Sequence, residues 1–247
     1  MIHPDAYLEQ LYDELEAARQ DQHQLPWEAR RESLLSGLKQ ALGRYELTQR
    51  GTEGLDPVLL ERVELEEAIR ERVEFTTLGG MRMPAYVMIP KSIQPGERRP
   101  GVLLWHGHGY GSRSLVGLDK GGNPKPDTGK LSDNLAYALA KRGLVVLAPE
   151  IVGFGDRRLA RDVRKDPNIA NSCYNLSVSL MMTGRTTAGL RAAEALRAAD
   201  YLASRPEVDS GRLGNMGHSG GGMVASLSAA LDPRIQASVV AIYPNTY

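Results

Sequence analysis

The chain has 247 residues, of which 42% are hydrophobic and 24% are charged, a balance typical of a folded globular protein with one large domain, alone or with an appendage. The 30 basic residues are matched by 30 acidic ones, so the formal net charge of 0 argues against a nucleic-acid partner or an anionic membrane surface. The single cysteine, Cys173, excludes an intrachain disulfide.

The first ten residues carry Asp5 and Glu9 and no basic region followed by an apolar run, so we expect no signal peptide. No stretch approaches the roughly 20 apolar residues that span a bilayer. We therefore predict a cytoplasmic protein with no membrane partner.

The first 70 residues read as helices. Apolar residues recur at helical spacing over Leu8–Leu15 and again over Trp27–Leu42. Asp56 and Pro57 resemble the N-cap and first position of a third, shorter helix. We expect a helical N-terminal extension over residues 1–70 that packs on the main domain or on a second copy of the chain, and carries no chemistry.

From residue 71 the pattern becomes that of a sheet. Alternating residues around Val73 and Phe75, a turn at Gly79 and Gly80, and a return over Tyr86–Ile89 predict a hairpin. Strands and helices then alternate, with strands predicted over 102–105, 144–148, 213–216 and 235–242 and helices over 131–142, 190–204 and 220–231. Residues 71–247 are thus expected to form an α/β domain, with a mostly parallel sheet and helices on both faces. The intervening stretch 153–183 reads as irregular, a candidate lid or substrate wall.

One motif carries a chemical signature. The run from Gly217 to Gly221 reads Gly-His-Ser-Gly-Gly and lies between a predicted strand and a predicted helix. In that context the serine, Ser219, sits on a sharp turn with its hydroxyl projecting from the sheet, and glycines flank it because side chains there would collide with backbone. The N–H of Gly220, at the helix start, is a candidate donor to an oxyanion.

A second candidate donor follows an earlier strand. His106-Gly107-His108-Gly109 comes directly after the strand over 102–105, and we expect the N–H of His108 to complete an oxyanion hole, with that of Gly109 as the alternative. A metal pair of His106 and His108 is the rival interpretation, but further ligands are not evident nearby, so we predict no metal and no other cofactor. His106 is then expected to be structural.

Five runs of the sequence resemble a known family, and they lie in Leu104–Gly109, Pro149–Asp156, Gly184–Thr186, Ala195–Leu202 and Val208–Gly222. Together they are similar to α/β-hydrolases of the dienelactone hydrolase and acetyl xylan esterase type, from about residue 71 onward. Dienelactone hydrolase itself has a cysteine nucleophile, whereas this chain has Ser219, which favours the serine esterases. The resemblance implies an α/β-hydrolase fold, Ser219 as nucleophile and the amides of Gly220 and His108 as oxyanion donors.

The rest of a catalytic triad is not evident. In this fold the acid and the histidine follow the nucleophile in the sequence, yet His3, His23, His106, His108 and His218 all precede Ser219. His218 is adjacent to the serine and points elsewhere on such a turn, and Glu150, at a strand end, has no base to orient and is expected to line the site or hold the turn at 153–155. We therefore expect that the C-terminus is truncated and that the 247-residue chain alone turns over little ester.

The sequence thus predicts a hydrolase of small-molecule carboxylic esters that acts through an acyl-enzyme on Ser219. Two alternatives remain open. One is a peptidase on the same fold, and the other is a catalytically inactive hydrolase fold used for binding, which the missing acid and histidine would favour.

Overall fold

The structure is a computed structural model that describes residues 3–126 and 133–243. The chain divides into two compact units, Met1–Ala41 and Leu42–Tyr247. The first is helical and the second contains the sheet, so each is described by itself.

The N-terminal unit consists of α1 (Asp5–His23) and nearly all of α2 (Trp27–Leu42), which confirms the first two predicted helices. Gly43, at a φ of 91°, ends α2, a backbone conformation that glycine adopts readily. Apolar side chains on both helices are exposed, among them Tyr7, Leu8, Tyr12, Leu15 and Trp27. That these helices pack on the main domain or on a second copy of the chain stays a prediction.

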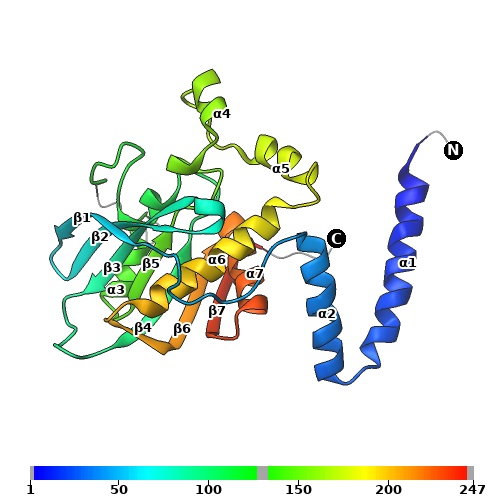
Figure 1. The fold of residues 1–247 in the computed structure, drawn as a ribbon, viewed down its shortest axis with the longest axis horizontal. Coiled ribbons are helices and arrows are strands. Elements are labelled where there is room, and N and C mark those ends of the chain that lie inside the picture. Colours follow the sequence, from blue (N-terminus) through cyan, green and yellow to red (C-terminus); the bar gives the residue numbers. More distant parts are fainter. Residues whose placement is uncertain (1–2, 127–132, 244–247) are drawn as a thin grey trace. The chain divides into compact units, whose positions relative to one another are not determined.

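The second unit is built on a seven-stranded sheet with the order β1-β2-β3-β5-β4-β6-β7 (Figure 1). The strands are β1 (Val58–Glu64), β2 (Ala68–Thr76), β3 (Arg82–Pro90), β4 (Arg99–Trp105), β5 (Val145–Pro149), β6 (Val208–His218) and β7 (Ile235–Ala241). The pairings from β1 to β5 are antiparallel, and those joining β5, β4, β6 and β7 are parallel. The carboxyl ends of β4, β5 and β6 therefore meet at one edge, which is where ligands bind in open α/β sheets.

Helices cover both faces of this sheet. Helix α3 (Leu135–Ala140) lies on one face, and α6 (Thr187–Ser204) and α7 (Gly220–Leu231) lie on the other. The segment between β5 and α6 contains two more helices, α4 (Ala160–Lys165) and α5 (Cys173–Met181). One core cluster joins α6 and α7 to residues such as Phe75, Val87 and Leu103. A second joins α3 and the 3₁₀ turn Ser112–Val116 to their neighbours on the opposite face, such as Met88 and Leu104. The expected α/β class, with helices on both faces, is confirmed, but the sheet is mixed, because parallel pairing is confined to the core strands β5, β4, β6 and β7.

The predicted third helix is wrong, because residues Val58–Glu64 form strand β1. Asp56 has a φ of 42° and does not cap a helix, and β1 pairs along β2 from Val58↔Glu74 to Glu64↔Ile69. Cross-strand pairing with a neighbouring segment overrides the local capping signal. The boundary expected between residues 70 and 71 consequently falls inside β2.

Two further expectations change. The helix predicted over 131–142 is shorter, since α3 spans Leu135–Ala140 and residues 131 and 132 lie outside the described part of the chain. The segment 153–183 is not irregular throughout, because it contains α4 and α5. The remaining predicted strands and helices are confirmed, most with ends shifted by a few residues.

Candidate active site

Ser219 occupies the turn between β6 and α7, as the sequence motif predicts. Its φ of 53° and ψ of −123° lie outside the regions that residues with a side chain normally adopt. The turn is held by the N–H of Ser219, which donates to Ala241 O at 2.9 Å, and by the N–H of Met223, which donates to Ser219 O at 3.1 Å. The strained backbone at a half-buried serine is the geometry expected of a nucleophile.

The two flanking glycines allow backbone segments to touch at this turn. A Cβ at Gly217 would collide with the carbonyl oxygen of Gly221. A Cβ at Gly221 would in turn collide with the carbonyl oxygens of Trp105 and His106, at the end of β4. The start of α7 therefore packs directly on the loop that follows β4, and only glycine fits at both positions.

The loop after β4 lies against the serine turn through two histidine rings. A Cβ on Gly107 would meet the ring of His218, and one on Gly220 would lie 3.1 Å from Cε1 and Nδ1 of the His108 ring. Within residues 3–126 and 133–243, the amide N–H groups of His108 and Gly220 donate no hydrogen bond, and the hydroxyl of Ser219 makes none either. Two unpaired amides thus belong to adjoining turns beside an unpaired hydroxyl.

The ring of Phe154 packs against both histidines of this loop. Its ring meets His106 and His108 edge-on, with centroids 5.4 Å and 5.2 Å apart, and the guanidinium of Arg191 lies 5.3 Å from the Phe154 centroid. Partial burial lowers the pKa of His108, and the nearby positive charge of Arg191 lowers it further. The imidazole beside Gly220 is therefore held in its neutral form at neutral pH.

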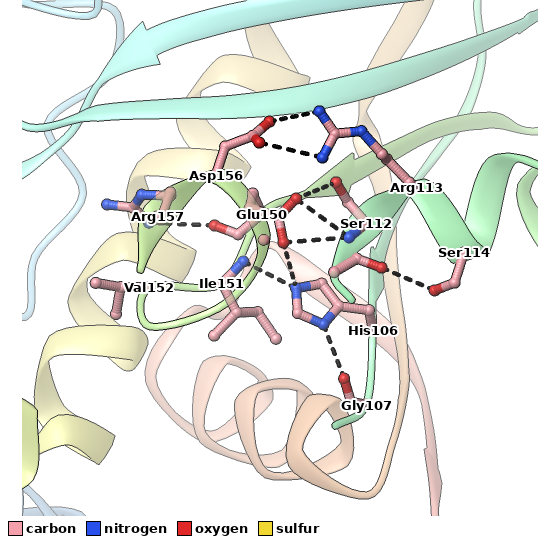
Figure 2. Close-up of polar contacts among 12 residues, drawn as sticks. His106, Gly107, Ser112, Arg113, Ser114, Glu150, Ile151, Val152, Asp156 and Arg157 are labelled. Carbon is pink, nitrogen blue, oxygen red and sulfur yellow. Dashed lines mark hydrogen bonds and ion pairs between the residues drawn. The ribbon is translucent and has the colours of Figure 1, made fainter. Parts of the chain in front are cut away.

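His106 is buried and holds the loop, as expected for a structural histidine. Its Nδ1 lies 2.9 Å from Gly107 O, and its Nε2 accepts the N–H of Ile151 at 3.0 Å (Figure 2). The side chain of His106 is therefore directed toward the end of β5. In the described part of the chain, no group of three or more His, Cys, Asp or Glu side chains is arranged to hold a metal ion.

A cleft of about 280 Å³ begins at the same loop. Gly109 and Tyr110 form one side of it, and Gly155 and Asp156 form another. Its other lining residues are Arg113, Lys120, Arg158, Asn168, Ile169 and Ala170. The cleft thus adjoins the loop that carries the candidate oxyanion donor and offers both charged and apolar contacts.

Sequence reasoning proposed Ser219, Gly220 and His108 as site residues but did not identify the side chains that pack around their loops. Arg191 and Ser112 come from separate elements and no local motif marks them, whereas Phe154 lies in the run Pro149–Asp156 without its packing on the histidines being evident from that run. Glu150 was expected to line the site or hold the turn at 153–155. It is buried, with 2% of its surface exposed, and it contacts Ser112, His106 and Gly155.

Comparisons with known proteins identify what the chain is similar to. Residues 128–247 match the model of the dienelactone hydrolase family. Over 191 residues the chain is 32% identical to the Bacillus subtilis (strain 168) protein named "Putative hydrolase YtaP", covering 74% of this chain and 56% of that protein. The chain thus spans about half the length of the curated relative it matches.

Solved structures share the fold at lower identity. A "putative acetyl xylan esterase" from Bacteroides fragilis NCTC 9343 superposes with a TM-score of 0.68 at 20% identity, over 85% of this chain and 53% of that one. A glucuronoyl esterase from Solibacter usitatus gives 0.55 at 16% identity, over 85% and 57%. No helix between residues 3 and 243, leaving aside 127–132, is long and apolar enough to cross a membrane.

Proposed function

Because the chain belongs to the dienelactone hydrolase family, we propose that it is a serine hydrolase of small carboxylic esters. The observation that carries the proposal is the strained turn at Ser219, which packs on the loop that carries the His108 amide. Among the described residues, the Ser219 hydroxyl and the amides of Gly220 and His108 have no hydrogen-bond partner. Strain of this kind persists only where the surrounding structure enforces it, and it is concentrated at functional sites.

The proposed reaction has two steps. The hydroxyl of Ser219 attacks the ester carbonyl, and the amides of Gly220 and His108 stabilise the negative charge on the carbonyl oxygen. Collapse of this intermediate expels the alcohol and leaves an acyl group on Ser219, which water then releases as the carboxylic acid. The alcohol or acyl part of the substrate would occupy the cleft beside Gly109 and Tyr110.

The general base is not assigned to a residue of this chain. His106 is buried and its two ring nitrogens are engaged with Gly107 and Ile151. The ring of His218 lies against Gly107. Neither histidine is therefore placed to take the proton of Ser219.

The test is hydrolysis of p-nitrophenyl acetate by the protein and by Ser219→Ala. Loss of the nucleophile is expected to abolish the Ser219-dependent turnover, which is itself expected to be low in this chain because no general base is assigned. Ser226→Ala is the matched control, because that serine lies two turns along α7 and bonds only to Gly222 O, at 2.8 Å. A Ser219→Ala variant as active as the parent would refute the proposal.

Three outcomes would distinguish the proposed function from its two alternatives. Mass spectrometry of the protein quenched during turnover is expected to find the acetyl group on the peptide that contains Ser219. Faster cleavage of aminoacyl amides than of acyl esters would instead identify a peptidase. A wild-type rate no greater than that of Ser219→Ala, with no acylated peptide, would identify an inactive hydrolase fold.

A further inference from the structure

Arg191, on α6, is a buried cation whose charge has no direct counter-ion. Only 8% of its surface is exposed, and its guanidinium forms no ion pair with any of the described residues. Nη2 donates to the backbone oxygen of Val152 at 3.0 Å and to Sγ of Cys173 at 3.2 Å, and neither acceptor is a carboxylate. Nε is buried and, within the same described residues, has no hydrogen-bond partner.

Two other buried arginines of this domain are paired with carboxylates. Arg157 binds Glu194, and Arg197, also on α6, binds Asp200. Glu194 lies one turn along α6 from Arg191, but both of its carboxylate oxygens bond to Arg157. Burying a charge without a partner is costly, so an unpaired arginine beside a candidate active site indicates a functional role.

The ring of Phe154 connects Arg191 to the serine turn. The guanidinium lies 5.3 Å from the centroid of this ring, in a cation–π contact, and the ring meets that of His108 edge-on with the centroids 5.2 Å apart. The His108 ring packs in turn on the start of α7, where a Cβ on Gly220 would lie 3.1 Å from its Cε1 and Nδ1. One aromatic ring therefore separates the charge of Arg191 from the side chain of a candidate oxyanion donor.

The side chain of Arg191 also lies where β4 and α7 meet. Trp105 and Val224 line the same small space as Arg191. Trp105 is the last residue of β4, directly before the loop that carries His108, and Val224 lies one turn into α7 from Gly220. The two segments that supply the candidate donor amides thus both begin beside this cation.

The charge of Arg191 already acts on the His108 ring. Burial is the main cause that lowers the pKa of His108, and the positive charge of Arg191 lowers it further. The other groups that face the ring are the uncharged ring of Phe154, the backbone of Gly220 and the His106 ring of the same loop. A charge that disfavours a cation at His108 favours an anion there.

We propose that Arg191 is a positioning residue that holds Phe154 against His108 and directs its unpaired positive charge toward the oxyanion that forms on the substrate. The inference rests on the proposed function. A charge in a poorly solvated interior acts over a longer range than in water, and its place is fixed before the reaction begins. Because the oxyanion exists only in the transition state and the intermediate, the effect is expected on kcat and not on substrate binding.

The test compares Arg191→Met, which removes the charge at a similar side-chain length, with Arg191→Lys, which keeps it. With p-nitrophenyl acetate, Arg191→Met is expected to lower the Ser219-dependent kcat roughly 3- to 20-fold with KM within about twofold, as for a charge about 10 Å from the oxyanion. Arg191→Lys is expected to stay within about threefold of the parent. A lysine variant as slow as the methionine variant would overturn the proposal, and so would a methionine variant as fast as the parent.

Arg197→Met is the matched control, because Arg197 is buried on the same helix but is paired with Asp200. It is expected to reduce stability and to leave kcat within about twofold of the parent, when both are assayed well below their unfolding temperatures. An equal loss of kcat in Arg197→Met and Arg191→Met would reduce the effect to general destabilisation and overturn the proposal. If Arg191→Met does not fold, Arg191→Gln replaces it, because glutamine removes the charge and can still donate to Val152 O.

Titration of the His108 ring by NMR tests the placement of the charge without turnover, with the signal assigned by its loss in His108→Asn. Arg191→Met is expected to raise the pKa of His108, because a nearby positive charge is lost, while Arg191→Lys and Arg197→Met keep it near that of the parent. If the parent shows no Ser219-dependent turnover, the proposed function fails and this titration alone decides whether Arg191 acts on the loop. An unchanged pKa of His108 in Arg191→Met would overturn the inference.

Discussion

At the scale of single residues, the glycines around Ser219 are required for space rather than for flexibility. Gly221 lies where a Cβ would collide with two carbonyl oxygens at the end of β4, whereas a Cβ on Gly109, in the neighbouring loop, would meet no atom within 4 Å. The same substitution at the two sites should therefore have different consequences.

We predict that Gly221→Ala lowers the free energy of unfolding by about 1–3 kcal/mol, because the new methyl group forces the start of α7 away from β4. Gly109→Ala, the matched control, should change it by less than about 0.5 kcal/mol. Urea denaturation of both variants measures the difference. Unfolding midpoints that coincide would show that the turn can accommodate a side chain.

The turn at Ser219 can be predicted from the sequence because the residues that it requires are close together in the chain. The spacing of Gly217, Ser219 and Gly221 is visible in the sequence, and so is the run from His106 to Gly109. The bond between Ser112 and Glu150 is not, since 38 residues separate them and only the pairing of β4 with β5 brings them together. Supporting contacts of this kind cannot be read from a motif.

At the scale of elements, α6 begins at a cap that also binds Leu42, the first residue of the second unit. The hydroxyl of Thr186 accepts the N–H of Gly189 at 2.9 Å and donates to Leu42 O at 2.7 Å. Both a helical amide and a carbonyl 144 residues away in the sequence thus depend on one hydroxyl.

Thr186→Ala is expected to lower stability by about 0.5–2 kcal/mol, the usual cost of removing an N-cap side chain. Thr186→Ser keeps the hydroxyl and should lower the free energy of unfolding by no more than a few tenths of a kcal/mol. Thermal unfolding followed by circular dichroism compares the two. If serine and alanine prove equally destabilising, the methyl group of Thr186 and not its hydroxyl is what matters.

Elements with strong local signals were predicted correctly, and those set by their partners were not. Helix α7 spans Gly220–Leu231, as expected from its glycine start and apolar spacing. Residues 58–64 carry apolar residues that suit a helix as well as a strand, and their pairing with β2 decides between the two. The capping pattern at Asp56 and Pro57 gave no information about that pairing.

At the scale of the whole molecule, a buried ion pair on α6 binds the loop that precedes β1. Arg197 contacts Asp200 at 2.8 Å and also donates to the carbonyl oxygens of Gly51 and Glu53, at 2.9 Å and 2.7 Å. The side chain therefore joins a helix of the sheet domain to a loop about 145 residues earlier in the chain.

Arg197→Met should lower the free energy of unfolding by about 3 kcal/mol, near the lower end of the range for breaking a buried pair. Asp200 keeps Arg234 as a partner at 2.8 Å, which limits the loss. The control is Arg212→Met, because its pair with Asp209 has the same spacing but is solvent-exposed and should contribute about 0–1 kcal/mol. Denaturant titration measures the free energy of unfolding of both variants. A similar decrease in the two would show that burial does not make the Arg197–Asp200 pair more stabilising than the exposed pair.

The strand order itself was beyond sequence reasoning. Alternation predicts that parallel strands exist, but not that β4 lies between β5 and β6. That arrangement decides which loops become neighbours, and hence which residues surround Ser219.

The central place of β4 has a consequence for a chain emerging from the ribosome. The loop at 106–112 is synthesised about a hundred residues before the turn at Ser219, and its anchor at Glu150 arrives between them. A nascent polypeptide of about 200 residues therefore contains this loop and Glu150 but not Ser219. Reactivity can begin only when β6 inserts beside β4, so the proposed chemistry is withheld until the sheet is nearly assembled.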